Sequence, residues 1–74
     1  MAFDYSRLTG KIVEKYRTQY LFAIAMGLSE RSLSLKLNNK VPWKDEEIYK
    51  AVDLLGIRKT EIGKYFFTQE IQVG

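Results

Sequence analysis

Hydrophobic residues recur at helical spacing in several segments of the chain, and glycine, proline and asparagine separate these segments. In the first segment, Leu8, Ile12 and Tyr16 line one face of a predicted helix over residues 6–17, with Val13 beside them. Basic side chains occupy the opposite face, where they can remain solvated. The first predicted element is therefore an amphipathic helix.

Two short helices are expected next, and polar capping residues mark where each begins. Thr18 is a good N-cap for a helix over residues 19–26, and Gly27 can adopt the left-handed conformation that ends it. Ser29 can then cap a third helix over residues 30–37. The pattern predicts two helices joined by a turn that contains a glycine and a capping residue.

A fourth helix is expected after an extended connector. Pro42 disfavours helix at the residue before it, so residues 41–43 are expected to be extended. The helix itself is predicted over residues 45–55, because its acidic first turn suits the positive end of the helix dipole and Gly56 can end it.

The last part of the chain predicts a short fifth helix and an aromatic contribution to the core. Thr60 can cap this helix, which runs toward Phe66, and the weak alternation over residues 67–73 allows a short strand. Four aromatic residues are expected in the core rather than in a ligand site: Trp43, Tyr65, Phe66 and Phe67. The whole pattern predicts an all-α protein with five helices.

Composition limits both the number of domains and the available chemistry. A chain of 74 residues is expected to form a single domain, residues 1–74, with one small core. It has no cysteine and no histidine, which excludes disulfides, thiolate zinc sites and the usual general base. The acidic residues gather at helix starts, where capping explains them, and no glycine-rich phosphate loop is present. We therefore expect neither an enzyme nor a bound cofactor.

No segment suggests a membrane or an exported protein. The longest apolar stretch is well short of the roughly 18 residues that a membrane span requires, and no basic segment followed by an apolar run opens the chain. The sequence predicts a soluble, cytoplasmic protein without a membrane partner.

The positive charge is concentrated in one short segment. The chain has a net charge of +3, from twelve bases and nine acids. Residues 31–44 contain four bases and no acid, which leaves eight bases against nine acids elsewhere, or -1. The four are Arg31, Lys36, Lys40 and Lys44. Such a cluster attracts phosphate, although an ordinary solvated surface would explain it equally well.

The two short helices over residues 18–39 form the central motif. Phe22 and Met26 lie four apart on the first of them, and Leu28 and Leu33 continue the apolar contact into the second. This is the spacing of a helix-turn-helix, whose second helix enters the DNA major groove. A generic helical bundle would show the same apolar pattern.

Residues 18–34 resemble the helix-turn-helix of the phage Cro and repressor superfamily. Residues 36–40, 43–48 and 62–67 resemble a subgroup of small phage-encoded regulators. Five residues fall where the superfamily places them: Gln19, Ala23, Gly27, Ser29 and Leu33. The resemblance implies a compact lambda-repressor-like DNA-binding domain of five helices that regulates the switch between lysogenic and lytic growth.

The resemblance also implies DNA contacts in and beside the helix over residues 30–37. Gln19 and Ser29 would contact phosphate, and Arg31 would read a base, because a guanidinium can bond guanine O6 and N7 together. Ser34 would meet a base or a phosphate one turn later.

Four other positions complete the predicted DNA interface. Asn39, Lys40 and Lys44 follow the recognition helix and would position the protein on the DNA backbone. For the two lysines a simple solvated charge is an equally good explanation. Glu30 lies at a position that commonly meets bases, but its carboxylate suits the helix amino terminus better.

Several residues depart from the superfamily pattern. Leu35 stands where a polar base reader is common, and could pack on a thymine methyl or on another protein. Lys36 stands where an apolar core residue is usual, and Leu37 is expected to take that place.

Further departures lie on the helix over residues 19–26. If Phe22, Ala23 and Met26 point inward, three apolar side chains face outward as a patch that can bind a partner, unless another part of the chain covers it: Tyr20, Leu21 and Ile24.

Two functions follow from these observations. The first is a phage regulator that binds double-stranded operator DNA as a homodimer, through the helix over residues 30–37. The alternative is a modulator or antirepressor that binds a partner phage repressor through four apolar residues: Tyr20, Leu21, Ile24 and Leu35.

Overall fold

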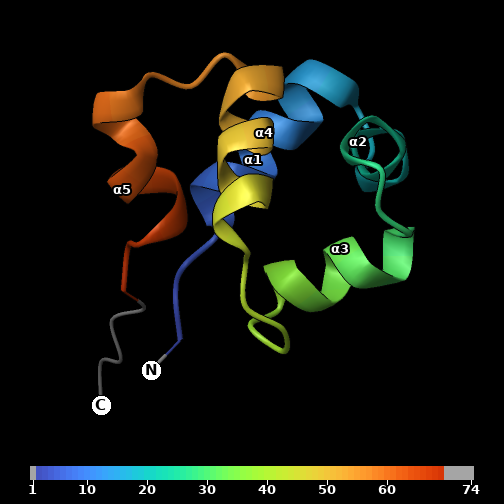
Figure 1. Ribbon diagram of the computed structural model, residues 1–74, viewed down its shortest axis with the longest axis horizontal. Coiled ribbons are helices and arrows are strands. Elements are labelled where there is room, and N and C mark those ends of the chain that lie inside the picture. Colours follow the sequence, from blue (N-terminus) through green and yellow to red (C-terminus); the bar gives the residue numbers. More distant parts are fainter. Residues whose placement is uncertain (1, 70–74) are drawn as a thin grey trace.

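A computed structural model describes residues 2–69 and shows five α-helices (Figure 1). The elements in chain order are α1 Ser6–Tyr16, α2 Gln19–Met26, α3 Glu30–Leu37, α4 Asp45–Leu55, the 3-10 turn Lys59–Glu61 and α5 Ile62–Phe66. The all-α fold with five helices is confirmed, and α2, α3 and α4 have the predicted bounds. Within the described residues, none of the helices is long and apolar enough to cross a membrane.

The helices surround a core to which each of the five contributes. α1 packs against α2, α4 and α5, and α2 packs against both α3 and α4. In Figure 1, α1 and α4 lie in the middle of the molecule, with α2 and α3 on one side and α5 on the other. The largest fully buried side chains are Phe22, Phe66, Leu8, Ile12, Leu33 and Leu55.

Side chains of the chain itself cap α2 and α3 as predicted. Thr18 Oγ1 accepts a hydrogen bond of 3.1 Å from the Leu21 N–H, and Ser29 Oγ accepts one of 3.1 Å from the Ser32 N–H. Each bond satisfies an amide that has no partner within the helix. Gly27 ends α2 in the left-handed region, with φ of 74°.

Three sequence expectations about packing are wrong. Val13 is exposed rather than part of the buried face of α1. Thr60 lies inside the 3-10 turn, and no side chain caps α5. Of the four aromatic residues expected in the core, Phe66 is buried and Trp43 and Tyr65 are partly buried, but Phe67 is exposed. Periodicity locates a hydrophobic face, but it does not say how far the neighbouring elements cover it.

The expected tail strand is reduced to a single contact in the part that the structure describes. Gln69 forms an isolated antiparallel bridge with Phe3, and the Asp4 N–H donates to the Thr68 carbonyl at 2.7 Å. Residues 70–73 of the predicted strand lie outside the described residues.

Gly27 and Gly10 should respond in opposite directions to the same substitution. Gly27→Ala should lower the free energy of unfolding by about 1 kcal/mol, because alanine is strained at positive φ. Gly10 lies within α1, and a Cβ there would meet nothing within 4 Å. Gly10→Ala should therefore raise the free energy of unfolding by up to about 1 kcal/mol. Urea unfolding of both variants measures this, and equal effects would contradict the assigned turn geometry.

Candidate functional site

A short turn holds α2 and α3 in a fixed relation. The Gly27 N–H donates to the Ile24 carbonyl at 3.1 Å, and the Leu28 N–H donates to the Ala23 carbonyl at 2.9 Å. Ala23 is almost completely buried, so its small side chain lets neighbouring elements approach α2 closely. The two helices therefore present their outer surfaces as one unit.

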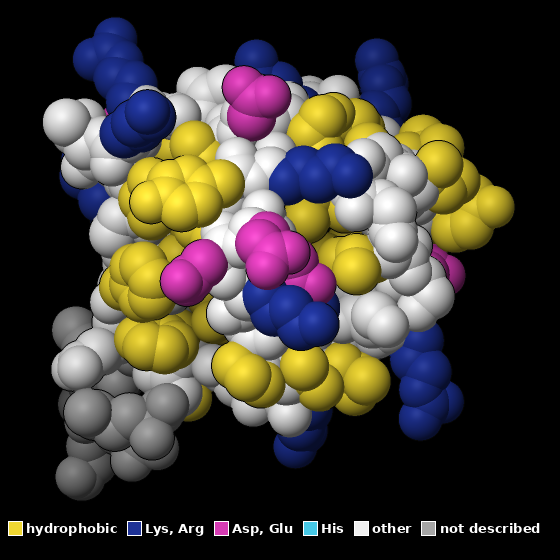
Figure 2. Space-filling view, viewed as in Figure 1, with side chains coloured by type: hydrophobic (Ala, Val, Ile, Leu, Met, Phe, Trp, Pro, Cys, Tyr) yellow, Lys and Arg dark blue, Asp and Glu magenta, His cyan; other side chains and the backbone are white. Residues whose placement is uncertain are grey.

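The outer surface of α2 is apolar. Tyr20, Leu21 and Ile24 are 55%, 47% and 58% exposed, and we call these three residues the α2 patch. Hydrophobic side chains are visible at the edge of the molecule that α2 forms (Figure 2). The prediction that they face outward is confirmed, and neither α1 nor the tail as far as Gln69 covers them. A contiguous exposed apolar surface on a small domain is typical of a binding site.

α3 offers a mixed surface beside the α2 patch. Arg31 and Glu30 are both exposed in its first turn, so this turn carries one positive and one negative side chain. Leu35 is half-buried one turn further along. Lys40 and Lys44 are exposed in the connector between α3 and α4.

Short polar side chains near α3 serve the helices themselves. The hydroxyl of Ser29 caps α3 and also donates to Ser32 Oγ at 2.9 Å. Ser34 Oγ accepts from Asn38 Nδ2 at 3.3 Å, and the same Nδ2 donates to the Ser34 carbonyl at 2.8 Å. Gln19 is half-buried at the start of α2. The DNA contacts expected of Gln19, Ser29 and Ser34 stay predictions.

Lys36 is buried, contrary to the sequence expectation. Its side chain enters the molecule, with Nζ 2.9 Å from Glu47 Oε1 and 3.3 Å from the Pro42 carbonyl. Leu37, expected to take the core position, is only partly buried against the core. Because Glu47 neutralises Lys36, the exposed basic charge of residues 31–44 comes from three side chains rather than four: Arg31, Lys40 and Lys44.

Glu47 gathers several favourable contacts at the start of α4. Its Oε1 accepts the Lys44 N–H at 2.9 Å in addition to the Lys36 ammonium. Burial alone would raise the pKa of Glu47, but the Lys44 N–H, the Lys36 ammonium and the nearby Lys44 charge together hold it below its usual value. The carboxylate is therefore the form that joins α3 to α4.

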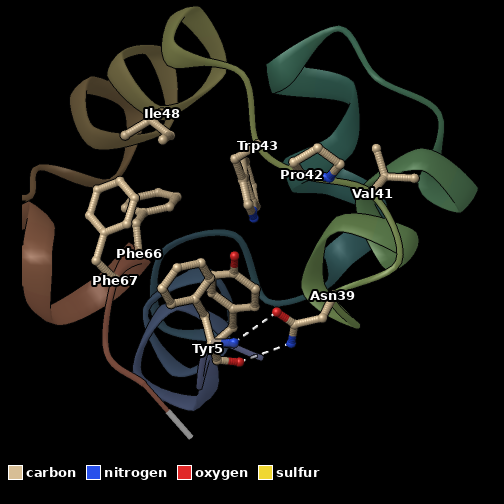
Figure 3. A pocket seen from close by; sticks show the side chains of 9 residues that line it. Tyr5, Asn39, Val41, Pro42, Trp43, Ile48, Phe66 and Phe67 are labelled. Atoms are coloured by element: carbon tan, nitrogen blue, oxygen red, sulfur yellow. Dashed lines mark hydrogen bonds between the residues drawn. The ribbon is translucent and has the colours of Figure 1, made fainter. Parts of the chain in front are cut away.

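Asn39 holds the amino-terminal segment instead of pointing freely toward solvent. The Phe3 N–H donates to Asn39 Oδ1, and Asn39 Nδ2 donates to the Phe3 carbonyl, both at 2.9 Å (Figure 3). The backbone of Asn39 has a φ of 62°, a conformation that asparagine tolerates well. The side chain expected on a DNA phosphate is thus engaged in a structural contact, and its phosphate contact stays a prediction.

An aromatic hollow lies beside this contact. It has a volume of about 320 Å³, and its lining includes Phe3, Tyr5, Trp43, Phe66 and Phe67. Trp43 packs edge-on against Phe66 with ring centroids 5.2 Å apart, and its indole nitrogen points toward Tyr5 (Figure 3). Burial raises the pKa of the Tyr5 hydroxyl. Among the described residues that line the hollow, none has an ionisable group suited to acid or base catalysis near neutral pH.

The fold and the surface define a class: a small all-α protein in which a rigid helix pair presents exposed apolar side chains. Residues 1–69 match the family described as protein of unknown function DUF739, and the chain belongs to this family. No curated protein matches it.

A solved structure is similar over nearly the whole chain. It is the solution structure of the modulator of repression (MOR) of the temperate bacteriophage TP901-1 from Lactococcus lactis. The two share 61% sequence identity with a TM-score of 0.81, and the match covers 97% of each chain.

Removing the Glu47 carboxylate should destabilise the fold in a pH-dependent way. Glu47→Gln leaves the Lys36 ammonium buried without a counter-charge, so we expect a loss of about 2 kcal/mol of unfolding free energy at pH 7. Glu47 has a lowered pKa, so its contribution is present above the unfolded pKa of about 4.3 and is lost as the pH falls through the folded pKa. Wild type and variant should therefore converge in acid, at a pH below the folded pKa of Glu47.

Urea unfolding of the wild type and of Glu47→Gln, at pH 7 and at a pH low enough to protonate Glu47, measures the difference in unfolding free energy. Glu14→Gln is the matched control, because Glu14 forms an exposed pair with Lys11 and should contribute less than about 0.5 kcal/mol. A loss at pH 7 no larger than that of the control would contradict the assigned role of Glu47.

Proposed function

We propose that this protein is a modulator of repression that binds a phage repressor through the α2 patch and Leu35. The observation that carries the proposal is the exposure of Tyr20, Leu21 and Ile24, about half of each side chain, on one short helix. The 61% identity to the modulator of repression of a temperate phage supports a regulatory role of this kind. Such a partner would be met in the cytoplasm of the bacterial host.

The chemistry of the surface favours a protein over DNA as the main target. Phosphate contacts need cations or hydrogen-bond donors, but the α2 patch has no cation, and the Tyr20 hydroxyl is its one side-chain donor. Glu30 adds a negative charge to the same helical turn as Arg31, and the ion pair with Glu47 removes Lys36 from the exposed charge. Apolar side chains that lose water on contact are instead what stabilises protein interfaces.

A lysine in the centre of the α2 patch should weaken the complex with the repressor. Leu21→Lys places a charge where the proposal requires an apolar contact, and desolvating that charge should weaken binding at least about tenfold. The fold should survive because Leu21 is already half exposed. Titration calorimetry with the repressor of the same phage measures the affinity.

Val13→Lys is the matched control for this experiment. Val13 is an exposed apolar residue on α1, outside the α2 patch, so a lysine there should leave repressor binding unchanged. An unchanged affinity for Leu21→Lys would exclude the α2 patch from the interface.

Operator binding is the second candidate, and the exposed position of Arg31 at the start of α3 favours it. In this case a homodimer would place two copies of α3 in successive major grooves. Glu30, Lys40 and Lys44 would then lie close to the DNA backbone. Phage regulators that bind operators lose affinity steeply as salt rises, because they release counterions.

Arg31→Ala distinguishes this candidate from the first. If Arg31 reads a base, the variant should lose about 1 to 3 kcal/mol of operator affinity and some of its sequence preference. Mobility-shift titrations with the phage promoter region at two salt concentrations measure both effects. Binding that is absent at low salt, or unchanged by Arg31→Ala, would contradict base reading by α3.

A further inference from the structure

A second apolar surface lies between α4 and α5, away from α2. Five residues line a hollow of about 200 Å³ there: Asp45, Ile48, Tyr49, Ile62 and Phe67. Tyr49 and Phe67 are 63% and 53% exposed, so two aromatic rings are open to solvent at its rim. Figure 2 shows hydrophobic side chains over α4 and α5 gathered around an acidic side chain.

The one charged side chain that lines this hollow, among residues 2–69, is Asp45, and the preceding Lys44 does not line it. Among residues 2–69, no lysine or arginine lies within 4.0 Å of the Asp45 carboxylate, and none lines the hollow. The position of Asp45 in the first turn of α4 is explained by the helix dipole. The dipole does not explain two exposed aromatic rings beside it, so the combination requires another account.

We propose that this hollow binds the side chain of an arginine on a protein partner. The guanidinium can stack on the face of Tyr49 or Phe67 while it pairs with the Asp45 carboxylate, and its aliphatic stem can cover Ile48 and Ile62. Arginine fits better than lysine, because a planar guanidinium can stack on a ring and bond a carboxylate at the same time.

The site is independent of repressor binding by the α2 patch. The two surfaces share no residue and lie on different helices. The protein can therefore hold the repressor at α2 and an arginine of a second protein at α4 and α5.

The test uses the whole, 15N-labelled chain and N-acetyl-arginine amide as the probe, at pH 7 and low salt. Chemical shift changes should concentrate at Asp45, Tyr49 and Phe67 and should saturate at a probe concentration on the order of tens of millimolar. N-acetyl-citrulline amide has the same shape without the charge and should bind much more weakly. Equal shifts with the two probes would overturn the proposal.

Two variants assign the contacts. Asp45→Asn and Tyr49→Leu should each weaken binding about threefold, because each removes one of the two interactions that recognise the cation. Glu14→Gln, an exposed acid on α1, should leave it unchanged. Binding that neither variant weakens would overturn the proposal, as would sedimentation showing that Tyr49→Leu dissociates a dimer, since a second copy would then occupy the hollow.

Discussion

The ion pair between Lys36 and Glu47 is the interaction on which the exposed surfaces depend. α3 packs mainly against α2, so the contact of 2.9 Å from Lys36 Nζ to Glu47 Oε1 is an important link from α3 to α4. The Pro42 carbonyl and the Lys44 N–H join the same cluster, which fixes the connector as well. A buried lysine is strongly destabilising without its counter-charge, so the ion pair favours the arrangement that keeps Lys36 of α3 beside Glu47 of α4. It also removes one cation from a surface that would otherwise suit DNA.

The same helix pair could serve DNA or a protein, and the outward side chains determine which. The turn at Gly27 and the caps at Thr18 and Ser29 fix how α2 and α3 lie relative to each other. They do not determine what the outer surfaces of the two helices bind. On this scaffold, Tyr20, Leu21 and Ile24 expose a mostly apolar surface that has no cation for a phosphate backbone. The similarity to a phage modulator of repression agrees with this chemistry.

Local signals made most of the fold predictable from the sequence. Helix bounds follow from caps, glycine stops and 3.6-residue periodicity, all of which act within a few positions. The same periodicity predicts that the side chains of the α2 patch face outward. The burial of Lys36 could not be predicted in this way, because its partner Glu47 lies eleven residues further along and belongs to another helix. The engagement of Asn39 by Phe3 across 36 residues, and the exposure of Val13 and Phe67, likewise depend on tertiary packing. The aromatic and acidic hollow of α4 and α5 joins residues from two helices that no sequence motif connects.

Cross-saturation NMR on the complex with the phage repressor tests the central claim most directly. With unlabelled repressor irradiated, saturation should pass to the methyl groups of Leu21, Ile24 and Leu35, which belong to the proposed interface. The methyl groups of Val13, exposed on α1, provide an internal reference that should lose little intensity. Saturation that reaches Val13 but spares Leu21 and Ile24 would contradict the claim that α2 binds the repressor.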